Sequence, residues 1–259
     1  MSRRVRPSEH VLLSVGALAG LIVLWELAVR VGGLSQLIFA PPTAVGSALV
    51  GLIQGGELPT RLLESFETFT IGFGSAAVVG VALGLLNGWY RRVYYSFDLI
   101  LTALYSTPAI VLLPLFIIVL GPGLPSQITI VFLTGFFPII FTTSSGVRAI
   151  DRQLIRAGRS LGANDLEIFR DVAIPGSVPY ILSGLRVGIG RSIVGLLFSE
   201  WFGGSRGIGY LVGLYGQTFQ TARLLALIVI VILLSLVLVE GLKQIESRYL
   251  QRVGTQDAR

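Results

Sequence analysis

The sequence contains no cysteine, and its single histidine and single lysine are His10 and Lys243. Without cysteine the chain forms no disulfide, thiolate metal site or cysteine nucleophile. One histidine in a charged N-terminal stretch excludes a zinc-protease motif and a serine–histidine dyad within this chain. A P-loop requires G-x-x-x-x-G-K-[ST], and the lysine stands in Gly-Leu-Lys-Gln. We therefore expect no metal site and no nucleotide site of that kind.

Charge is also scarce. Only 13% of the 259 residues are charged and 53% are hydrophobic, whereas soluble domains carry about 25% charged residues. The mean hydropathy is +0.79. So few charges cannot cover a soluble globule, and so much hydrophobicity excludes a disordered chain. The net charge is +6, and nearly all of the basic residues are arginine. We attribute this excess of positive charge to orientation in a membrane and not to nucleic-acid binding.

Six apolar stretches predict an all-α, polytopic membrane protein with six transmembrane helices. They cover residues 11–29, 68–90, 99–120, 127–145, 181–199 and 224–242. The charge-free run 99–147 is divided in two because Gly-Pro-Gly-Leu-Pro at 121–125 interrupts it. Neighbouring helices satisfy the carbonyls that a membrane proline leaves free, so we expect Pro108, Pro114 and Pro138 to kink their spans without ending them.

The distribution of basic residues predicts the orientation of these spans. One side carries fourteen of them: Arg3, Arg4, Arg6, Arg91, Arg92, Arg148, Arg152, Arg156, Arg159, Arg170, Lys243, Arg248, Arg252 and Arg259. The other side carries four: Arg30, Arg61, Arg206 and Arg223. Because basic residues concentrate in cytoplasmic loops, we expect both termini and the 146–180 loop in the cytoplasm, in a multi-pass protein of the cell membrane.

Small residues recur along two spans. In the second they are Gly72, Ala76, Gly80, Gly84 and Gly88, a pattern typical of helix packing. In the fifth, the spacing predicts that one face carries Gly184, Gly188, Arg191, Gly195 and Ser199. An intramembrane charge is a candidate functional residue. Arg191 either pairs with a structural partner or, with Gly188, Gly195 and Ser199, lines a path that favours anions.

Three other charges near the spans have simpler interpretations. Arg186 lies closer to the cytoplasmic end of the fifth span, and we interpret it as structural. Glu26 and Arg30 are four residues apart in the first span, a spacing that predicts a local ion pair.

The 146–180 loop is patterned as two short amphipathic helices. Residues 151–161 suit one helix, which Gly162 ends. Asn164, with Glu167 three residues later, predicts a capping box that begins the second, and we expect Pro175 to end it. Such a pair either lies on the membrane surface or docks onto a partner.

The spacing within this loop resembles a known motif. Importer permeases of the ATP-binding-cassette (ABC) class carry Glu-Ala-Ala, three residues, Gly, nine residues and Ile-x-Leu-Pro. Here the sequence has Arg156-Ala157-Gly158, three residues, Gly162, nine residues and Val172-Ala173-Ile174-Pro175. The glycine, the proline and their spacing match, whereas Arg156 and Gly158 replace the family's Glu and second Ala.

Further segments resemble the subgroup of these permeases that serves sulfonates, taurine, nitrate and bicarbonate. They are Phe39-Ala40-Pro41-Pro42, Arg148–Asp151, Ser160–Ala163, Gly184-Leu185-Arg186, and Glu200 with Gly207–Leu211. The resemblance implies a type I importer permease fold with a cytoplasmic coupling helix. It divides the chain into a tail and first helix (1–36), a permease core (37–250) and a C-terminal tail (251–259).

The resemblance further implies that the loop docks onto a separate ATPase subunit. The residues it assigns to this coupling are Arg156, Ala157, Gly158, Leu161, Gly162, Ala163, Asp165, Leu166, Glu167, Ile168, Phe169 and Pro175. Apolar members are the expected anchors, and charged members would pair at the rim.

By the same resemblance, the chain is not itself an enzyme and binds no cofactor. Its implied partners are two ABC ATPase subunits that bind ATP, a second permease copy, a solute-binding protein outside the cell, and lipid. The solute class is a small anion, with a thiamine precursor or another small heterocycle as the alternative. An ATP-independent carrier and a membrane enzyme are competing classes. The outer segment 203–216 forms either a gate or a plain loop.

Overall fold

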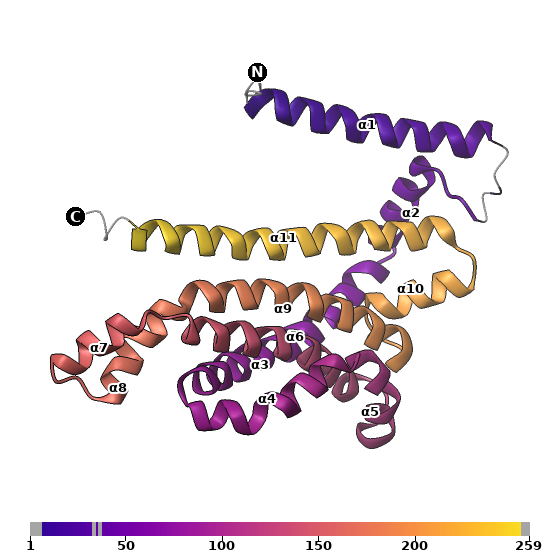
Figure 1. Cartoon of the computed structure of the whole chain (residues 1–259). Coiled ribbons are helices and arrows are strands. Elements are labelled where there is room, and N and C mark those ends of the chain that lie inside the picture. The colour runs from indigo at the N-terminus through magenta and orange to yellow at the C-terminus, as the bar shows by residue number, and fades with distance from the viewer. Residues whose placement is uncertain (1–6, 33–34, 36–37, 255–259) are drawn as a thin grey trace. The chain divides into compact units, whose positions relative to one another are not determined.

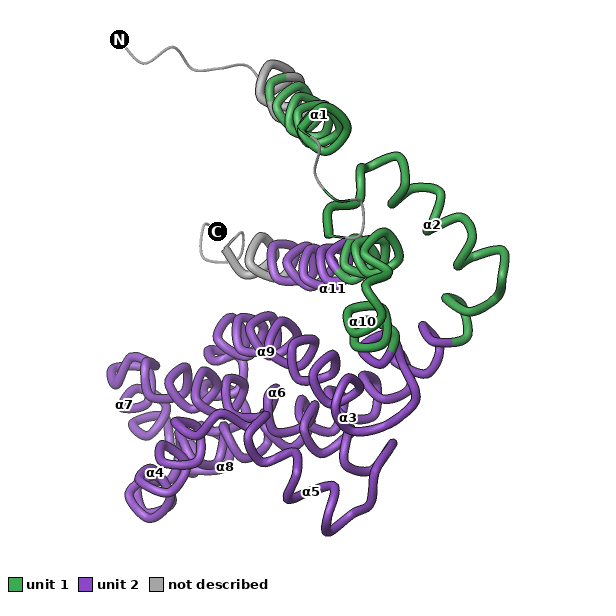
Figure 2. The backbone as a smooth tube through the Cα atoms, turned by 90° about the vertical axis from the view of Figure 1, so that its right-hand side faces the viewer, with its two compact units in different colours: residues 1–60, 211–231 green, residues 61–210, 232–259 purple. Residues whose placement is uncertain are grey.

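The computed structural model describes residues 7–32, 35 and 38–254, and every regular element within them is helical (Figure 1). The arginines at positions 3, 4, 6 and 259, which contribute to the predicted orientation, lie outside the described residues. The chain divides into two compact units (Figure 2). Unit 1 comprises residues 1–60 and 211–231, and unit 2 comprises residues 61–210 and 232–259.

Unit 1 contains α1 (Pro7–Val31) and α2 (Pro42–Gln54). One acid joins them: Glu26 accepts a hydrogen bond from Arg30 and two from Thr43, through its amide (3.1 Å) and its hydroxyl (2.9 Å). The predicted local pair of Glu26 and Arg30 is confirmed. Through its bonds to Thr43, Glu26 also holds the start of α2. Pro42 occupies the first turn of α2, where its missing N–H costs nothing.

Helices α3 and α11 belong partly to each unit, and so does α10. Their bounds are Glu57–Trp89 for α3, Ile208–Gln217 for α10 and Thr221–Gly254 for α11. The remaining elements lie in unit 2: α4 (Arg91–Ser106), η1 (Ala109–Leu112), α5 (Leu113–Leu120), α6 (Leu124–Arg148), α7 (Arg152–Ser160), α8 (Asp165–Ile168), η2 (Phe169–Ala173) and α9 (Ile174–Gly203).

Four helical stretches of the described chain are long and apolar enough to cross a membrane, or five if a bent pair counts as one. The four are Glu57–Trp89, Leu124–Arg148, Asp165–Gly203 and Thr221–Arg248. Helix α1, which contains the first predicted span, is not among them. The bent pair is Arg91–Ser106 with Ala109–Leu120, which meet at 84°.

The prediction that Pro108 kinks the 99–120 span without ending its helix is therefore wrong, since α4 ends at Ser106. Thr107 is extended (φ −84°, ψ 124°), because the ring of Pro108 disfavours the helical conformation in the residue before it. Pro138, by contrast, lies inside α6, which continues past it as predicted. The hydroxyl of Thr142 donates to the Pro138 carbonyl at 2.7 Å.

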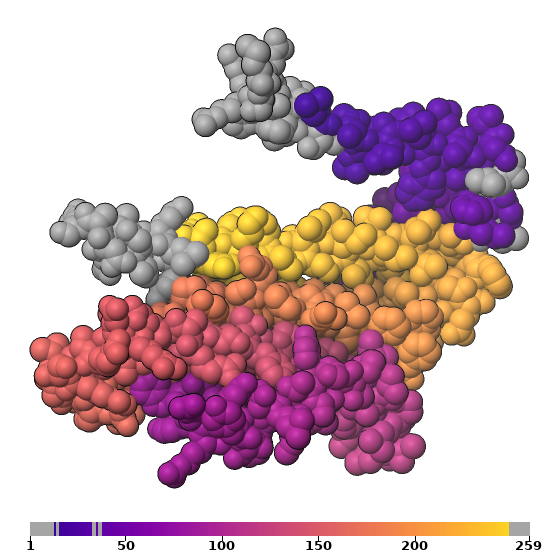
Figure 3. Space-filling view, in the orientation of Figure 1, coloured from indigo at the N-terminus to yellow at the C-terminus, as the bar shows by residue number. Residues whose placement is uncertain are grey.

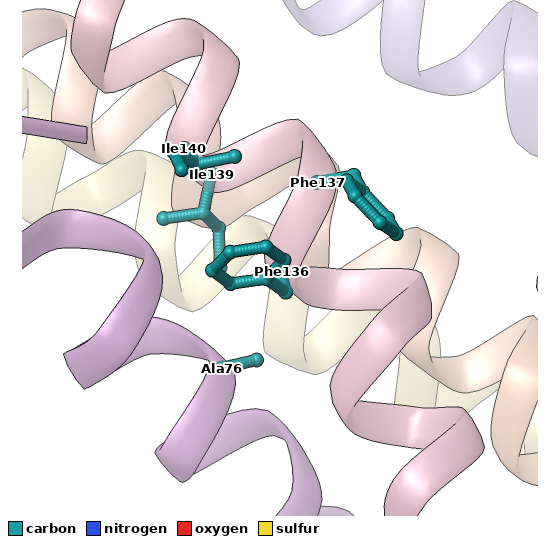
Figure 4. Close-up of a cluster of buried hydrophobic side chains, with 5 residues drawn as sticks. All are labelled: Ala76, Phe136, Phe137, Ile139 and Ile140. Atoms are coloured by element: carbon teal, nitrogen blue, oxygen red, sulfur yellow. The ribbon is translucent and has the colours of Figure 1, made fainter. Parts of the chain in front are cut away.

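Helix α6 lies at the centre of unit 2, between α3 and α9. Glycines of α3 face it so closely that a Cβ atom at Gly80 would lie 2.9 Å from Ile139, and one at Gly84 would lie 2.7 Å from Thr143. The predicted small-residue face of this span is confirmed as a packing surface. Beside it, five buried residues form an apolar core (Figure 4): Ala76, Phe136, Phe137, Ile139 and Ile140.

Helix α9 packs against α6 through a second small-residue face. Its buried members are Gly184, Gly188, Ser192, Gly195 and Ser199. Ser192 donates to the Val131 carbonyl of α6 at 3.1 Å. The prediction placed Arg191 on this face, but its side chain is exposed and Ser192 takes the position. A guanidinium would not fit where the two backbones approach so closely.

Candidate functional site

The loop between α6 and α9 is held by local hydrogen bonds at both of its helices. The side chain of Asp151 begins α7 by accepting from the Gln153 amide at 2.8 Å. At the other end of α7, Gly162 has a φ of +87°. The Gly162 amide donates to the Arg159 carbonyl at 3.0 Å, and the Ala163 amide donates to the Gly158 carbonyl at 3.1 Å. This pair of bonds is a Schellman motif, which requires a left-handed residue and therefore favours glycine. The predicted end of the helix is confirmed.

The second helix begins with the predicted capping box. Asn164 Oδ1 accepts from the amides of Leu166 and Glu167, both at 3.0 Å. The Glu167 carboxylate accepts in return from the Asn164 amide at 2.8 Å. An ion pair of 3.0 Å between Arg159 and Asp165 also ties α7 to α8. These contacts fix the angle of the turn from its own residues.

Pro175 does not end this helix, contrary to the prediction. The helical run is continuous from Asp165 to Gly203, and its wider turn Phe169–Ala173 is a π-helix. The Ile174 amide donates to the Phe169 carbonyl, five residues back. A π turn ahead of a proline accommodates the missing N–H and the ring, so the chain passes the proline without breaking.

The predicted coupling residues divide between an exposed and an inward-facing group. Leu161 and Leu166 are 89% and 72% exposed on the turn, which projects at the left of unit 2 in Figure 3. Ile168 is buried, and a Cβ atom on Gly158 would lie 3.4 Å from it. Phe169 packs its ring 5.4 Å from that of Trp89. Further exposed positions are Arg156, Ala157, Gly162, Asp165, Glu167 and Pro175, and Ala163 is half-buried.

Three of the predicted path residues are packed inside the described part of the chain. Gly188 and Gly195 are buried against Ile139 and Thr134 of α6, and Ser199 donates to the Leu196 carbonyl at 2.9 Å. Arg191 is exposed and forms no hydrogen bond or ion pair within the described part of the chain.

Arg186, five residues earlier on α9, is bound to the fold. Its guanidinium pairs with Glu246 of α11 at 3.0 Å. This contact agrees with the structural role predicted for Arg186. Arg191 is the guanidinium of α9 that remains free within the described residues.

A buried carboxylate holds the far end of α9. Glu200 is fully buried, and its Oε2 accepts from the Ser65 hydroxyl (3.0 Å) and the Gly209 amide (2.8 Å). Its Oε1 has no hydrogen-bond partner among the described residues. The sequence pointed to Glu200 only as part of a family resemblance, because its partner Ser65 lies 135 residues away.

The turn before α10 is fastened beside Glu200 by further contacts. The Gly207 amide donates to the Glu64 carboxylate at 2.8 Å, and the Ile208 amide donates to the Ser65 hydroxyl at 2.8 Å. Arg61 donates to the Ser205 carbonyl at 2.8 Å. Gly207 has φ +89°, a conformation that favours glycine. The turn is therefore fixed to α3 and α9 at several points.

The outer segment 203–216 is mostly helix and not a loop, since α10 occupies Ile208–Gln217. Tyr215 donates to Glu57 at 2.7 Å. Burial, followed by this hydrogen bond, raises the pKa of Tyr215 to about 12, so its hydroxyl remains a donor at neutral pH. No cluster of histidine and acids that could hold a metal is found within the described residues.

Three relatives match most of the chain. An ABC transporter permease protein of Methanocaldococcus jannaschii is 35% identical over 96% of this chain and 94% of its own. The taurine transport system permease protein TauC of Escherichia coli is 30% identical over 93% of this chain and 90% of its own. The formylaminopyrimidine transport permease protein ThiX of Halalkalibacterium halodurans is 28% identical over 88% of this chain and 90% of its own.

A solved structure shares the fold. The matching chain of the inward-facing MetNI methionine ABC transporter has a TM-score of 0.65 and 19% identity, with 74% of this chain and 95% of that chain covered. The model of the family described as "Binding-protein-dependent transport system inner membrane component" matches residues 76–250. The chain belongs to this family: it is a multi-pass inner-membrane permease component of a binding-protein-dependent ABC importer, and not the subunit that performs catalysis.

Proposed function

We propose that this permease is driven by separate ATPase subunits that bind the turn between α7 and α8. The observation that carries the proposal is a rigid turn with two outward-facing leucines, Leu161 and Leu166. Large apolar side chains exposed together on a capped, hydrogen-bonded turn favour insertion into a partner's cleft. Asp165, Glu167 and Arg156 surround them with charge that suits the rim of such a contact.

Two features of the turn support transmission of movement. Its Schellman motif and capping box resist bending, and its second helix continues without interruption into α9. In this proposal ATP stays on the partner subunits, and the chain holds no cofactor. Gly158 and Gly162 shape the turn, while Ile168 and Phe169 anchor it to the fold.

The direct test is co-purification with the host's ATPase in mild detergent. We expect Leu161→Glu with Leu166→Glu to release the ATPase, because two charges cannot occupy an apolar cleft. The matched control is Gln153→Glu with Arg170→Gln, which lowers the net charge by the same two units at exposed positions. Equal retention of the ATPase by both double variants would overturn the proposal.

For the solute we propose a small anion of the sulfonate, nitrate or bicarbonate type. Support comes from a relative named for taurine and from the unpaired guanidinium of Arg191 on a spanning helix. The second candidate, a small heterocycle, is supported by the relative named for formylaminopyrimidine. An anion path predicts that Arg191→Gln lowers uptake and that Arg191→Lys retains part of it. Unchanged uptake by Arg191→Gln would favour the heterocycle.

The remaining architecture is also proposed. We place both termini and the 146–180 loop in the cytoplasm and keep six spanning helices, with α1 as the first. Residues 37–250 form the permease core, which includes the family match at 76–250. A second copy of this chain would complete the pore, and a solute-binding protein would deliver cargo from outside. Crosslinking of single-cysteine variants tests the pairing, because the sequence has no cysteine of its own.

A further inference from the structure

A cavity of about 500 Å³ in unit 2 lies between the α3–α4 junction and α7. Its polar lining is mainly arginine and tyrosine: Arg91, Arg148, Arg152 and Arg159, with Tyr94 and Tyr95. The one acid in that lining, Asp165, is paired with Arg159 at 3.0 Å. The cavity is therefore strongly positive.

Two of these guanidinium groups are held by aromatic rings and not by carboxylates. Arg148 lies 4.0 Å above the centre of the Tyr94 ring. Arg91 donates to the Tyr95 hydroxyl at 3.4 Å and lies 5.8 Å from the centre of that ring. A stacked guanidinium keeps most of its N–H groups at its edge, free to bind an anion. Arg152 is exposed and has no hydrogen-bond or ion-pair partner in the described chain.

The surrounding residues place the cavity at the depth of lipid headgroups. The charge-free run 68–90 ends directly before Arg91, and its last two residues are Trp89 and Tyr90. Aromatic residues of this kind collect at the membrane–water interface. No residue of α4 is buried, and Phe97 and Leu99 are 52% and 80% exposed. An acyl chain has an apolar helix surface beside the cavity.

We propose that this cavity binds the phosphate group of an anionic phospholipid. Arginine forks match phosphate oxygens in two parallel hydrogen bonds. Tyr90 begins α4 without a side-chain cap, so the first amides of that helix add donors at the same edge. Basic pockets beside membrane helices favour such headgroups. The exposed apolar face of α4 favours a lipid over soluble phosphate.

The site would bring a lipid into contact with the loop that the permease presents to its partner. Arg152 and Arg159 belong to α7, whereas Arg91 begins α4 and Arg148 ends α6. One phosphate bound among them links these three elements. The proposal does not depend on ATPase docking, because lipid binding is measured on the purified chain alone.

Native mass spectrometry of the full chain tests the site with phosphatidylglycerol and phosphatidylcholine as probes. We expect tighter binding of phosphatidylglycerol, weakened roughly 25-fold by Arg148→Gln with Arg152→Gln, since each arginine near the surface contributes roughly fivefold. The matched control, Arg92→Gln with Arg170→Gln, removes two exposed arginines outside the cavity. Equal weakening in both variants, or equal binding of both lipids, would overturn the proposal.

Two further measurements keep the result unambiguous. Arg152→Gln alone removes an exposed side chain without a partner, so its thermal unfolding should be unchanged while phosphatidylglycerol binding falls roughly fivefold. Unchanged binding in this variant argues against the site. Sodium phosphate is then added as a competitor at millimolar concentration. Failure to displace the lipid supports a lipid site, whereas full displacement assigns the cavity to a soluble anion and overturns the lipid assignment.

Discussion

The carboxylate of Glu200 accepts a hydrogen bond of 2.8 Å from the amide of Gly209, so the last turn of α9 fastens the first turn of α10. Gly209 sits so close to α9 that an added Cβ would lie 2.8 Å from the Cβ of Glu200. Ser65 of α3 completes the contact through its own bond to the same oxygen. Helices α3, α9 and α10 are thus joined at one buried oxygen atom, although Ser65 of α3 is 135 residues away from Glu200 in sequence.

Removing this carboxylate should loosen the turn. We expect Glu200→Ala to lower the unfolding free energy by roughly 1–3 kcal/mol, because the buried Ser65 hydroxyl and Gly209 amide lose their acceptor. Glu200→Gln keeps an acceptor oxygen and should lose less. Thermal unfolding in detergent measures both. Equal melting temperatures for the wild type and Glu200→Ala would contradict this account.

Gly162 should not tolerate a β-branched residue. With φ +87° its conformation is one that L side chains rarely adopt, although no atom lies within 4 Å of an added Cβ. We expect Gly162→Val to abolish ATP-driven uptake by distorting the turn, at a local cost of about 1–2 kcal/mol. Gly162→Asn, which tolerates the left-handed region, is the control and should retain uptake. Normal uptake by the valine variant would count against a fixed turn.

The packing of α3 on α6 should be equally sensitive to side-chain size. A Cβ on Gly84 would lie 2.7 Å from Thr143 Cβ and 2.9 Å from the Ile140 carbonyl oxygen. We expect Gly84→Val to destabilise the fold by roughly 1–3 kcal/mol through overpacking. Gly74 lies on the same helix with nothing within 4 Å of an added Cβ, so Gly74→Val is the matched control. Similar melting temperatures for the two variants would refute close packing at Gly84.

The proposed orientation predicts that two introduced cysteines react differently with a label added from outside the cell. Ser160→Cys lies in the turn assigned to the cytoplasm, and Ser205→Cys lies before α10 on the opposite side. The natural sequence has no cysteine, so each label reports one position. We expect a membrane-impermeant maleimide added to intact cells to label Ser205→Cys and to spare Ser160→Cys. The reverse pattern would invert the topology.

Local signals in the sequence predicted the helix caps of the 146–180 loop accurately. The caps at Asp151 and Asn164 and the left-handed Gly162 are formed by neighbouring residues, so spacing alone locates them. The effect of a proline was harder to predict. Pro108 breaks a helix, Pro138 sits inside one, and Pro175 follows a π turn. Which outcome occurs depends on how neighbouring elements satisfy the freed carbonyls, and that is a tertiary property.

The placement of Arg191 on the small-residue face of α9 was predicted wrongly for the same reason. A spacing of three or four residues allows either Arg191 or Ser192 on the small face of α9, and only the approach of α6 selects the serine. The buried contacts of Glu200 likewise join residues 135 positions apart. Periodicity describes one helix at a time, so it does not identify partners on another helix.

The helical run from Asp165 to Gly203 is continuous, so it can transmit a movement of one end to the other. Its 39 residues span about 58 Å at about 1.5 Å per residue. A tilt of about 5° at the turn would shift the opposite end by about 5 Å, close to the rise of one helical turn. That end carries Glu200 and, through it, the start of α10. If the proposed partner binds at Leu161 and Leu166, this helix therefore carries a movement of the turn to Glu200 and the start of α10.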